Sequence, residues 1–468
     1  MANRRVLIIT HQFPPAAGGM VQRISGFCKY LQSFGWKPVI LTLRDDLYRV
    51  CDYSMLEKIK GIEVFKTFSL DVDSLKIFIL KRLRGGRDIK SHDPLRWVPR
   101  NPLFQRFKLF IERYILIPDP RLGWLPFAVF KGIKIMRDKK IDVILAVYPH
   151  PTTLFIGYIL HRFFNKPLLL DMHDTWTIYP EWLMGNNGRI LNSPVLRIRQ
   201  RLEEGMLKLL FDSASKIITN TGYMKDMYIR KYPSIPHFKY ITINNGYDPD
   251  DFAGIVNPPT PPLAMGKEGE ISKKGMGEGF KKFTIAFSGR YYRHHHPIYF
   301  LKGLKWLIDR HPEIRDKLSV IFVGNFGRDN EYELNRMGLK DVVNIIPYQP
   351  YRENLKILSD ADALLTTLIP PSDFDGYRIP SKVPEYLYLR KPILAIIPDG
   401  ELKRLIEDTK AGIVVNPEDT EGIGVAIYDL YKRHKNNSLY IKPDEEVIKG
   451  FDYRILSKKM ADVLNNSV

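Results

Sequence analysis

The sequence predicts an α/β protein with two Rossmann-like domains, each built on a doubly wound parallel sheet. Three observations predict this fold class. Short apolar runs, typical of buried parallel strands, alternate with stretches of helical spacing along nearly the whole chain. The alternation occurs before and after residues 253–282, which are rich in Pro, Gly and Lys and show no hydrophobic periodicity. A chain of 468 residues is also too long for one ordinary core, which indicates two domains.

The first alternating series begins with an apolar run at residues 6–10, followed by a loop that ends in Gly18 and Gly19 and by a helical stretch. With the next apolar run at residues 39–41, these segments form the strand, glycine loop, helix and strand of a Rossmann-like half. Further strands are expected at residues 62–65, 143–147, 168–170, 216–219 and 240–243. This series predicts an N-terminal domain over residues 1–252.

The glycine loop is not the fingerprint of a dinucleotide-binding enzyme. It lacks the G-x-G-x-x-G spacing, so a nicotinamide or flavin enzyme is not favoured. Gly18 and Gly19 still allow a phosphate to approach the backbone closely at the start of a helix. A glycine pair alone is a weak sign of phosphate binding, because it is more often simply a turn.

The second alternating series begins with a strand expected at residues 283–287, followed by the polar motif at residues 288–290. Further strands are expected at residues 319–323, 343–346, 363–366, 392–396 and 412–415. This series predicts a C-terminal domain over residues 283–445, which the linker or mobile loop 253–282 joins to the first. Residues 446–468 are expected to form a helix that packs back toward the N-terminal domain. Two such domains face each other across a cleft, where the carboxyl ends of the strands hold the ligand.

Residues 379–387 of the second series carry Ser381, Lys382 and Glu385. Ser381 is expected to cap a helix whose N-terminus attracts phosphate, with the charge of Lys382 beside it. Glu385 lies three residues further on the same face, where its carboxylate can accept from two vicinal hydroxyls of a ribose. Taken alone, the pair is more typical of a solvated ion pair.

An acid–His–acid cluster follows the strand expected at residues 168–170. Asp171, His173 and Asp174 lie at the carboxyl end of that strand, where a parallel sheet places its chemistry. A structural role is the alternative, with Asp174 capping a helix and a neighbouring group satisfying His173.

The net charge of +19 indicates an anionic partner or serves solubility. Residues 76–116 concentrate this charge, with eleven Lys or Arg against three acidic residues. Bulky aromatic residues are interleaved there: Phe78, Trp97, Phe104, Phe107, Phe110 and Tyr114. The pattern favours an anionic membrane surface over nucleic acid. A pair of basic helices with core aromatics is an equal alternative.

Cys28 and Cys51 are the only cysteines, and they lack metal-ligand spacing. They indicate a reducing compartment without a disulfide framework. The sequence shows neither a signal segment nor an uncharged apolar run long enough to span a membrane. We therefore expect a cytoplasmic protein, held peripherally at the inner face of the cell membrane if the basic segment binds lipid.

Five motifs, in this order, resemble glycosyltransferase family 4: Phe13-Pro14-Pro15 with Gly18-Gly19 and Arg23; residues 171–176; residues 244–248; Ser288-Gly289-Arg290; and Pro380-Ser381-Lys382 with Glu385-Tyr386-Leu387. Members of this family are retaining glycosyltransferases of the GT-B fold that use nucleotide-diphosphate sugars. The likeness is closest to members that build bacterial surface polysaccharides. It implies that the C-terminal half binds the donor and the N-terminal half binds the acceptor, a glycan or a polyprenyl-linked molecule.

The resemblance also implies a set of donor-binding residues: Gly18, Gly19, Gly289, Arg290, Arg293, Lys382 and Glu385. Among these, Arg290 and Lys382 would stabilise the negative charge of the leaving phosphate, which is the largest catalytic contribution in such a transfer. His173 or Asp174 would orient or deprotonate the acceptor hydroxyl.

The sequence departs from the family pattern at two places. Tyr377 occupies the position of a second glutamate that touches the sugar in many members, and Asp373 or Asp375 are candidates to replace it. The lysine that usually follows the first strand of the donor domain has two candidates here, Arg293 and Lys302. These departures leave the identity of the sugar open.

Three short motifs are candidate metal sites: residues 71–73, 373–375 and 294–296. The first two are Asp-x-Asp pairs, but neither lies where a single-domain GT-A enzyme would place one. Three consecutive histidines on a loop cannot all point inward. We expect no metal ligands and no cofactor, since the nucleotide-sugar is a substrate.

Two rival functions come from different classes. A GT-B-fold sugar-nucleotide epimerase would need paired acid and base residues in the cleft. A non-catalytic basic protein that binds membrane or nucleic acid would show binding that weakens steeply with salt. Nucleic acid is not the expected partner.

Overall fold

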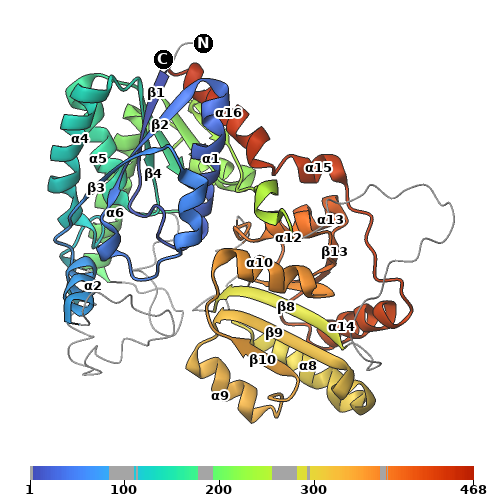
Figure 1. The fold of residues 1–468 in the computed structure, drawn as a ribbon. Helices are drawn as coiled ribbons and strands as arrows, with labels where there is room; N and C mark the ends of the chain where they lie inside the picture. Colours follow the sequence, from blue (N-terminus) through green and yellow to red (C-terminus); the bar gives the residue numbers. More distant parts are fainter. Residues whose placement is uncertain are drawn as a thin grey trace. The chain divides into compact units, whose positions relative to one another are not determined.

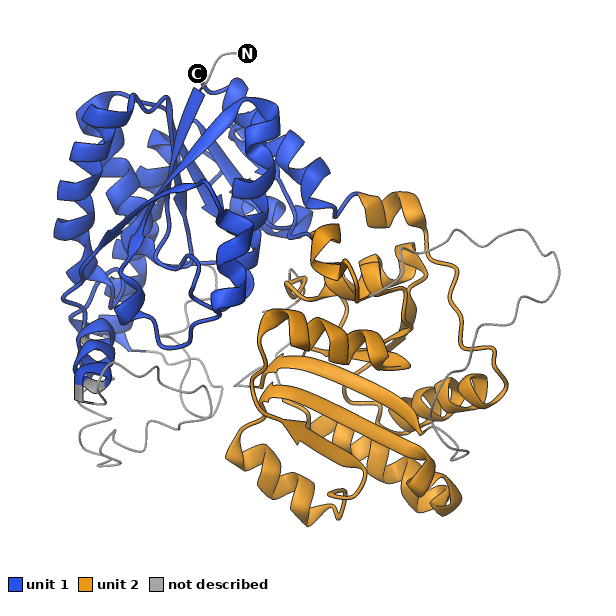
Figure 2. Cartoon of the chain, viewed as in Figure 1, with its two compact units in different colours: residues 1–247, 450–468 blue, residues 248–449 orange. Residues whose placement is uncertain are grey.

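The structure of the protein is a computed structural model that describes residues 4–83, 110–111, 114–177, 193–255, 282–291, 296–368, 376 and 378–468. The chain divides into two compact units, coloured separately in Figure 2. The first unit comprises residues 1–247 and 450–468, and the second comprises residues 248–449. The expected linker 253–282 lies almost wholly outside the described residues.

The first unit is built on a seven-stranded parallel sheet of order β3-β2-β1-β4-β5-β6-β7 (Figure 1). Its strands are β1 (Arg4–Ile9), β2 (Trp36–Leu43), β3 (Glu63–Thr67), β4 (Val143–Val147), β5 (Leu168–Met172), β6 (Lys216–Thr219) and β7 (Tyr240–Thr242). Its α-helices include α1 (Gly19–Leu31), α2 (Val72–Leu83), α4 (Leu125–Lys139), α5 (Pro151–Phe164), α6 (Pro194–Ser213), α7 (Gly222–Lys231) and α16 (Tyr453–Asn465). The strand order reverses between β1 and β4, which is where doubly wound sheets bind ligands.

Helices cover both faces of this sheet. Alternate residues of β4, from Val143 to Val147, belong to a core cluster with side chains of α1 and α16. The residues between them face α5, where a Cβ on Gly157 would come within 2.7 Å of the Cβ of Ala146. Hence α1 and α16 cover one face, and α5 covers the other. Because the ring centroid of Tyr453 lies 5.6 Å from that of Phe27, the end of the chain packs directly on α1.

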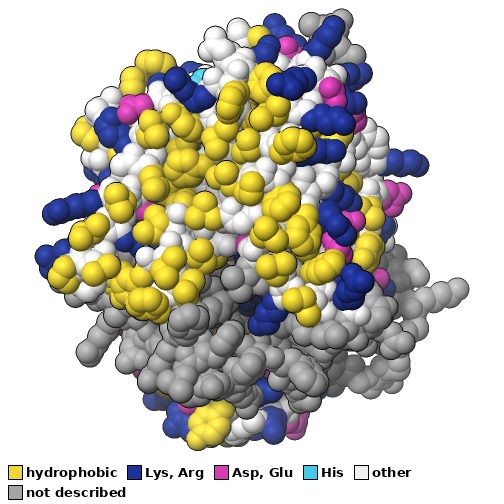
Figure 3. All heavy atoms as spheres, turned by 90° about the vertical axis from the view of Figure 1, so that its left-hand side faces the viewer, with side chains coloured by type: hydrophobic (Ala, Val, Ile, Leu, Met, Phe, Trp, Pro, Cys, Tyr) yellow, Lys and Arg dark blue, Asp and Glu magenta, His cyan; other side chains and the backbone are white. Residues whose placement is uncertain are grey.

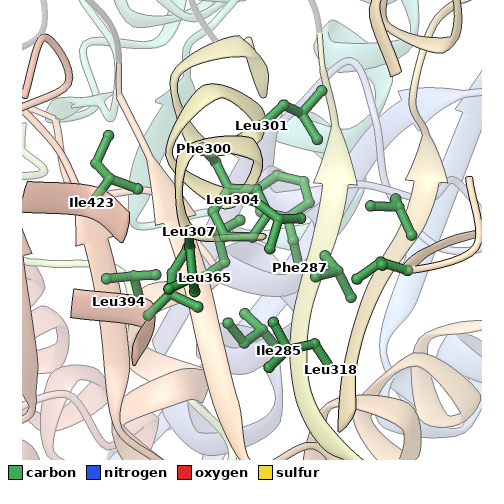
Figure 4. Close-up of a cluster of buried hydrophobic side chains, with 14 of the residues drawn as sticks. Ile285, Phe287, Phe300, Leu301, Leu304, Leu307, Leu318, Leu365, Leu394 and Ile423 are labelled. Carbon is green, nitrogen blue, oxygen red and sulfur yellow. The ribbon is translucent and has the colours of Figure 1, made fainter. Parts of the chain in front are cut away.

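The second unit is built on a six-stranded parallel sheet of order β10-β9-β8-β11-β12-β13. Its strands are β8 (Phe283–Arg290), β9 (Leu318–Asn325), β10 (Val343–Ile346), β11 (Ala363–Thr367), β12 (Ile393–Ile396) and β13 (Gly412–Val415). Its α-helices include α8 (Ile298–Arg310), α9 (Arg328–Arg336), α10 (Tyr351–Asp360), α12 (Val383–Leu389), α13 (Glu401–Thr409), α14 (Thr420–Lys435) and α15 (Glu445–Lys449). In Figure 4, Phe287, Leu304 and Leu394 belong to one apolar cluster between sheet and helices. Two doubly wound parallel sheets confirm the predicted fold class.

The basic segment expected at residues 76–116 is described only in part. Lys81 is buried, and its Nζ donates to a backbone carbonyl oxygen 3.5 Å away. The ring of Phe78 packs edge-on against Phe68, with 5.8 Å between the centroids. The burial of Lys81 agrees with the alternative of structural basic helices, so the expectation that this charge faces a membrane is wrong. Phe78 is half-buried. The aromatics at residues 97–107 lie outside the described residues.

Candidate functional site

The predicted glycine pair lies at the start of α1, after β1. The helix begins at Gly19, and Gly18 has a φ of 146°, a backbone conformation that residues with a Cβ rarely adopt. The first turn contains no acidic side chain, and the first amides of a helix have no partner within it. This end of α1 therefore suits an anion, as the sequence predicts.

Arg23, one turn further along α1, forms a buried bidentate ion pair with Asp171 at the end of β5. Its Nε and Nη2 each lie 2.9 Å from one carboxylate oxygen, and both side chains are fully buried. Its Nη1 also donates to the backbone carbonyl of Asn244, at 2.8 Å, in the loop after β7. Three motifs that are far apart in the sequence thus meet, and Asp171 serves to position α1 on the sheet.

His173 and Asp174 follow Asp171 in the sequence, directly after β5. His173 is half-buried, and its Nδ1 has no hydrogen-bond partner. Burial is the main reason that its pKa is lowered, so the imidazole is neutral at pH 7. Asp174 accepts from the backbone N–H of Thr175, at 2.9 Å. A neutral imidazole beside a carboxylate can both orient and deprotonate a hydroxyl.

Two further histidines, which the sequence reasoning missed, lie at the same edge of the sheet. His11 follows β1, His150 precedes α5, and their ring centroids are 4.6 Å apart. His11 is only 4% exposed, yet neither of its ring nitrogens has a hydrogen-bond partner. Burial lowers the pKa of both rings, that of His150 to about 3. Each histidine lies within three residues after a buried strand, and that position is the signal that could have identified them.

The Asp-x-Asp pair at residues 71–73 is held by a cation. Arg121 Nη1 lies 2.8 Å from Asp71 Oδ1 and 3.1 Å from Asp73 Oδ2. Asp71 also accepts from the backbone N–H and the hydroxyl of Ser74, at 2.9 and 2.6 Å, in the first turn of α2. Within the described part of the chain, no group of three or more His, Cys, Asp or Glu side chains could hold a metal ion.

Lys382 lies against the end of β8 in the second unit. Its Nζ donates to the backbone carbonyl of Ser288 and lies 3.8 Å from the centroid of the Phe287 ring. Gly289 has a φ of 145°, which strains any residue with a Cβ, and Nζ of Lys382 lies where that Cβ would be. Burial lowers the pKa of Lys382 to about 7. The predicted donor residues Gly289 and Lys382 are therefore neighbours in space.

The expected helix cap at Ser381 is wrong. The helix α12 begins at Val383, so the cap position falls on Lys382, and no side chain caps the helix. Lys382 already has helical dihedral angles, with φ −81° and ψ −19°. The cap position is thus one residue later than the sequence predicts, and a lysine side chain has no oxygen that could accept from the first-turn amides.

Glu385 is buried in α12 and accepts from the hydroxyl of Tyr351 at the start of α10. The distance between Oε1 and the Tyr351 oxygen is 2.7 Å, and Asp251 Oδ2 lies 3.1 Å from the same oxygen. A hydroxyl has one proton, so it can donate to only one of these carboxylates at a time. Burial and the two carboxylates raise the pKa of Tyr351, which keeps it protonated. Tyr351 thus orients the predicted ribose-binding carboxylate.

The other predicted donor residues lie elsewhere in the second unit or outside the described residues. Arg290 is the last residue of β8 and is exposed. Lys302, the rival of Arg293, lies on α8 with Nζ 5.7 Å from the ring of Tyr299. His296 lies just before the same helix, and its Nδ1 accepts from the Ile298 N–H at 3.2 Å. Several predicted residues lie outside the described part of the chain: Arg293, His294, His295, Asp373, Asp375 and Tyr377.

Two family models match the chain, one in each unit. The model for glycosyltransferase family 4 matches residues 91–251, and the model for glycosyl transferases group 1 matches residues 282–433. The two matched ranges together cover more than half of the sequence. The chain therefore carries a glycosyltransferase family 4 domain and a glycosyl transferases group 1 domain. The predicted resemblance is confirmed.

Individual relatives of this glycosyltransferase are distant in sequence. It is 22% identical to the colanic acid biosynthesis glycosyltransferase WcaL of Salmonella typhimurium over 150 residues, which cover 32% of this chain and 37% of WcaL. The structure resembles that of Anabaena HepE solved with UDP-glucose, with a TM-score of 0.58, 13% identity and 99% of each chain covered. It also resembles sucrose-phosphate synthase of Thermosynechococcus elongatus, with a TM-score of 0.60, 14% identity, and 99% of this chain and 98% of that one covered. These likenesses confirm the GT-B fold.

Proposed function

We propose that the protein transfers a sugar from a nucleotide-diphosphate sugar to a glycan or lipid-linked acceptor, with retention at the anomeric carbon, in the synthesis of a surface polysaccharide. The observation that carries this proposal is the arrangement around α12. Lys382 lies beside Gly289. One helical turn after Lys382, Glu385 accepts a hydrogen bond from Tyr351. The likeness to the colanic acid biosynthesis glycosyltransferase WcaL, and to HepE solved with UDP-glucose, supports the same chemistry.

Departure of the nucleotide diphosphate leaves negative charge on phosphate and positive charge on the sugar. A buried ammonium stabilises that phosphate charge strongly, because little water screens it. Lys382 is in this position, and its Nζ fills the space beside Gly289 that a side chain would occupy. Arg290 supplies a second cation at the end of the same strand. We propose that these side chains stabilise the leaving group without a metal.

The acceptor needs groups that bind and deprotonate a hydroxyl. We assign His173 and Asp174 to this role, with His11 and His150 beside them at the same edge of the sheet. A neutral imidazole offers one N–H donor and one acceptor nitrogen, which match a sugar hydroxyl. We further propose that the reaction takes place in the cytoplasm, with the protein bound peripherally to the inner face of the membrane that carries the acceptor. Among the described residues, no helix is long and apolar enough to cross a membrane.

A thermal-shift screen against nucleotides and their sugar conjugates tests the proposal. A nucleoside diphosphate at about 100 times its dissociation constant should stabilise the native protein by about 2.7 kcal/mol. Lys382→Met and Glu385→Gln should reduce this shift, whereas Lys305→Met on the exposed side of α8 should not. No shift with uridine or guanosine diphosphate would contradict the proposal. Epimerisation of a sugar nucleotide without any acceptor would favour the rival epimerase.

A further inference from the structure

The outer surface of the helix layer α4, α5 and α6 exposes bulky apolar side chains. Phe130 on α4 is 79% exposed and Phe163 on α5 is 70% exposed. Four aliphatic side chains on α6 are between 45% and 57% exposed: Val195, Ile198, Leu202 and Leu209. Figure 3 shows apolar side chains gathered on this side of the molecule, with Lys and Arg side chains around them. Soluble proteins rarely expose large side chains in such numbers on one face without a partner.

The α6 side chains form a stripe. Val195, Ile198, Leu202 and Leu209 follow one another at intervals of three, four and seven residues, which place them on one side of a helix. The opposite side of α6 packs inward through residues such as Leu196, Leu207 and Leu210. A helix that faced only water on its outer side would carry polar residues there. The outer stripe therefore indicates an apolar partner.

The three helices form one continuous layer. Gly132 of α4 lies so close to α5 that a Cβ would come within 2.6 Å of Leu160 Cδ1. Residues of α5 also contact α6. Phe130, Phe163 and the α6 stripe therefore belong to the same helix layer, on the sheet face opposite α1 and α16.

The charges of this layer identify the partner. Its exposed cations, in and directly after the three helices, are Lys134, Arg137, Lys140, Arg162, Arg197, Arg201 and Lys208. Its exposed acids are Asp138 and Asp212, and Asp212 pairs with Lys208 at 2.7 Å. Apolar groups mixed with this positive excess match the interface and headgroups of an anionic bilayer. A second copy of the same face would instead bring like charges together.

We infer that the outer face of α4, α5 and α6 binds an anionic lipid bilayer. This inference rests on the proposed function only for the reason to be at a membrane, namely access to a lipid-linked acceptor. It moves the contact from the basic segment expected at residues 76–116 to three helices of the first unit. Vesicle binding tests it without donor turnover, so that its failure is separate from failure of the proposed reaction.

The test is cosedimentation of the full chain with phosphatidylglycerol–phosphatidylcholine vesicles, and with phosphatidylcholine vesicles alone. The apolar variant combines four serine substitutions: Phe130→Ser, Phe163→Ser, Ile198→Ser and Leu202→Ser. The matched control combines three on exposed residues of the second unit: Tyr332→Ser, Val425→Ser and Tyr440→Ser. The wild type and the control should bind anionic vesicles, and the apolar variant should bind at least about tenfold more weakly. Its melting temperature should stay close to that of the wild type, because the substituted side chains are exposed.

A charge variant separates the electrostatic contribution: Lys134→Gln, Arg137→Gln, Arg162→Gln and Arg201→Gln. It should bind phosphatidylglycerol vesicles more weakly than the wild type, and added salt should weaken the wild type in the same way. The inference is overturned if the wild type does not bind anionic vesicles at low salt, or if the apolar variant binds them as well as the wild type does. It is also overturned if the wild type, without vesicles, is a dimer that the apolar variant turns into a monomer, because the face would then bind a second copy.

Discussion

Lys382 Nζ lies over the Phe287 ring, 3.8 Å from its centroid, and donates to the carbonyl of the next residue. This position removes the ammonium from water and lowers its pKa to about 7. The residue is therefore poised to gain a proton when an anion binds beside it. The same burial makes the charged form unfavourable when no anion is present.

Donor affinity should depend on pH through Lys382. Below about pH 7 the ammonium is charged and affinity for UDP-glucose should be highest. Above that pH the affinity should fall, by at most about tenfold for each pH unit, because binding must take up one proton. Lys382→Arg should bind with little dependence on pH over this range, since a guanidinium stays charged. Calorimetric titrations across pH 6 to about 9 would measure this, and an identical pH dependence in the wild type and in Lys382→Arg would contradict it.

Lys382 should also lower the stability of the free protein. Its folded pKa lies below the unfolded value of 10.5, so between about pH 7 and about pH 10.5 the unfolded chain binds the extra proton. Its contribution is therefore least favourable below about pH 7, and this penalty disappears as pH rises toward 10.5. Lys382→Met should raise the melting temperature at neutral pH while it weakens donor binding. A lower melting temperature in this variant would show that the lysine serves the fold.

Glu385, oriented by Tyr351, should bind the ribose hydroxyls of the nucleotide. Glu385→Gln should weaken binding of uridine diphosphate, but should hardly affect its 2′,3′-dideoxy analogue, which lacks both hydroxyls. Tyr351→Phe removes one hydrogen bond to the carboxylate and should weaken binding by about 0.5–1.5 kcal/mol. Titrations with the two nucleotides distinguish these effects. Equal losses for both ligands would mean that the carboxylate acts through the fold.

The buried ion pair Arg23–Asp171 should be essential for stability. Arg23→Met leaves a buried carboxylate without its partner and should cost about 3–5 kcal/mol in free energy of unfolding. Lys208→Met breaks an exposed Lys–Asp ion pair on α6 and should cost less than about 1 kcal/mol. Chemical denaturation measures both. Equal, small effects would contradict the structural role assigned to Asp171.

Activity should not require a divalent metal. Lys382 and Arg290 are proposed to stabilise the leaving phosphate, and the Asp-x-Asp pair at residues 71–73 is already bound to Arg121. Enzyme treated with EDTA should keep its rate of donor turnover. Loss of that rate, restored by manganese or magnesium, would contradict this prediction and direct attention to Asp373 and Asp375.

The parts of the fold that depend on local pattern could be predicted from the sequence. Buried parallel strands are apolar on both faces, so runs such as residues 6–10 and 143–147 identify them directly. The glycine pair marks the start of α1, because Gly18 needs a positive φ there. The position of Lys382 beside Gly289 followed only from the family resemblance, since 93 residues separate them in the sequence.

The parts that depend on distant partners could not be predicted in this way. Asp171 belongs to an apparent catalytic cluster in the sequence, but its partner Arg23 is 148 residues away. Ser381 fits a helix cap by residue type, yet the cap position of α12 falls on Lys382. Lys81 belongs to a basic segment, but tertiary packing buries it. In each case the side chain's role depends on three-dimensional neighbours that sequence spacing does not reveal.

The central claim is that α12 and the end of β8 bind a nucleoside diphosphate. Isothermal titration of uridine or guanosine diphosphate into the wild type and into the double variant Lys382→Met/Glu385→Gln tests it most directly, with Lys305→Met as the control. We expect saturable 1:1 binding to the wild type and the control, and an affinity at least about tenfold lower in the double variant. Equal affinity in all three proteins, or no binding of either nucleotide to the wild type, would contradict the claim.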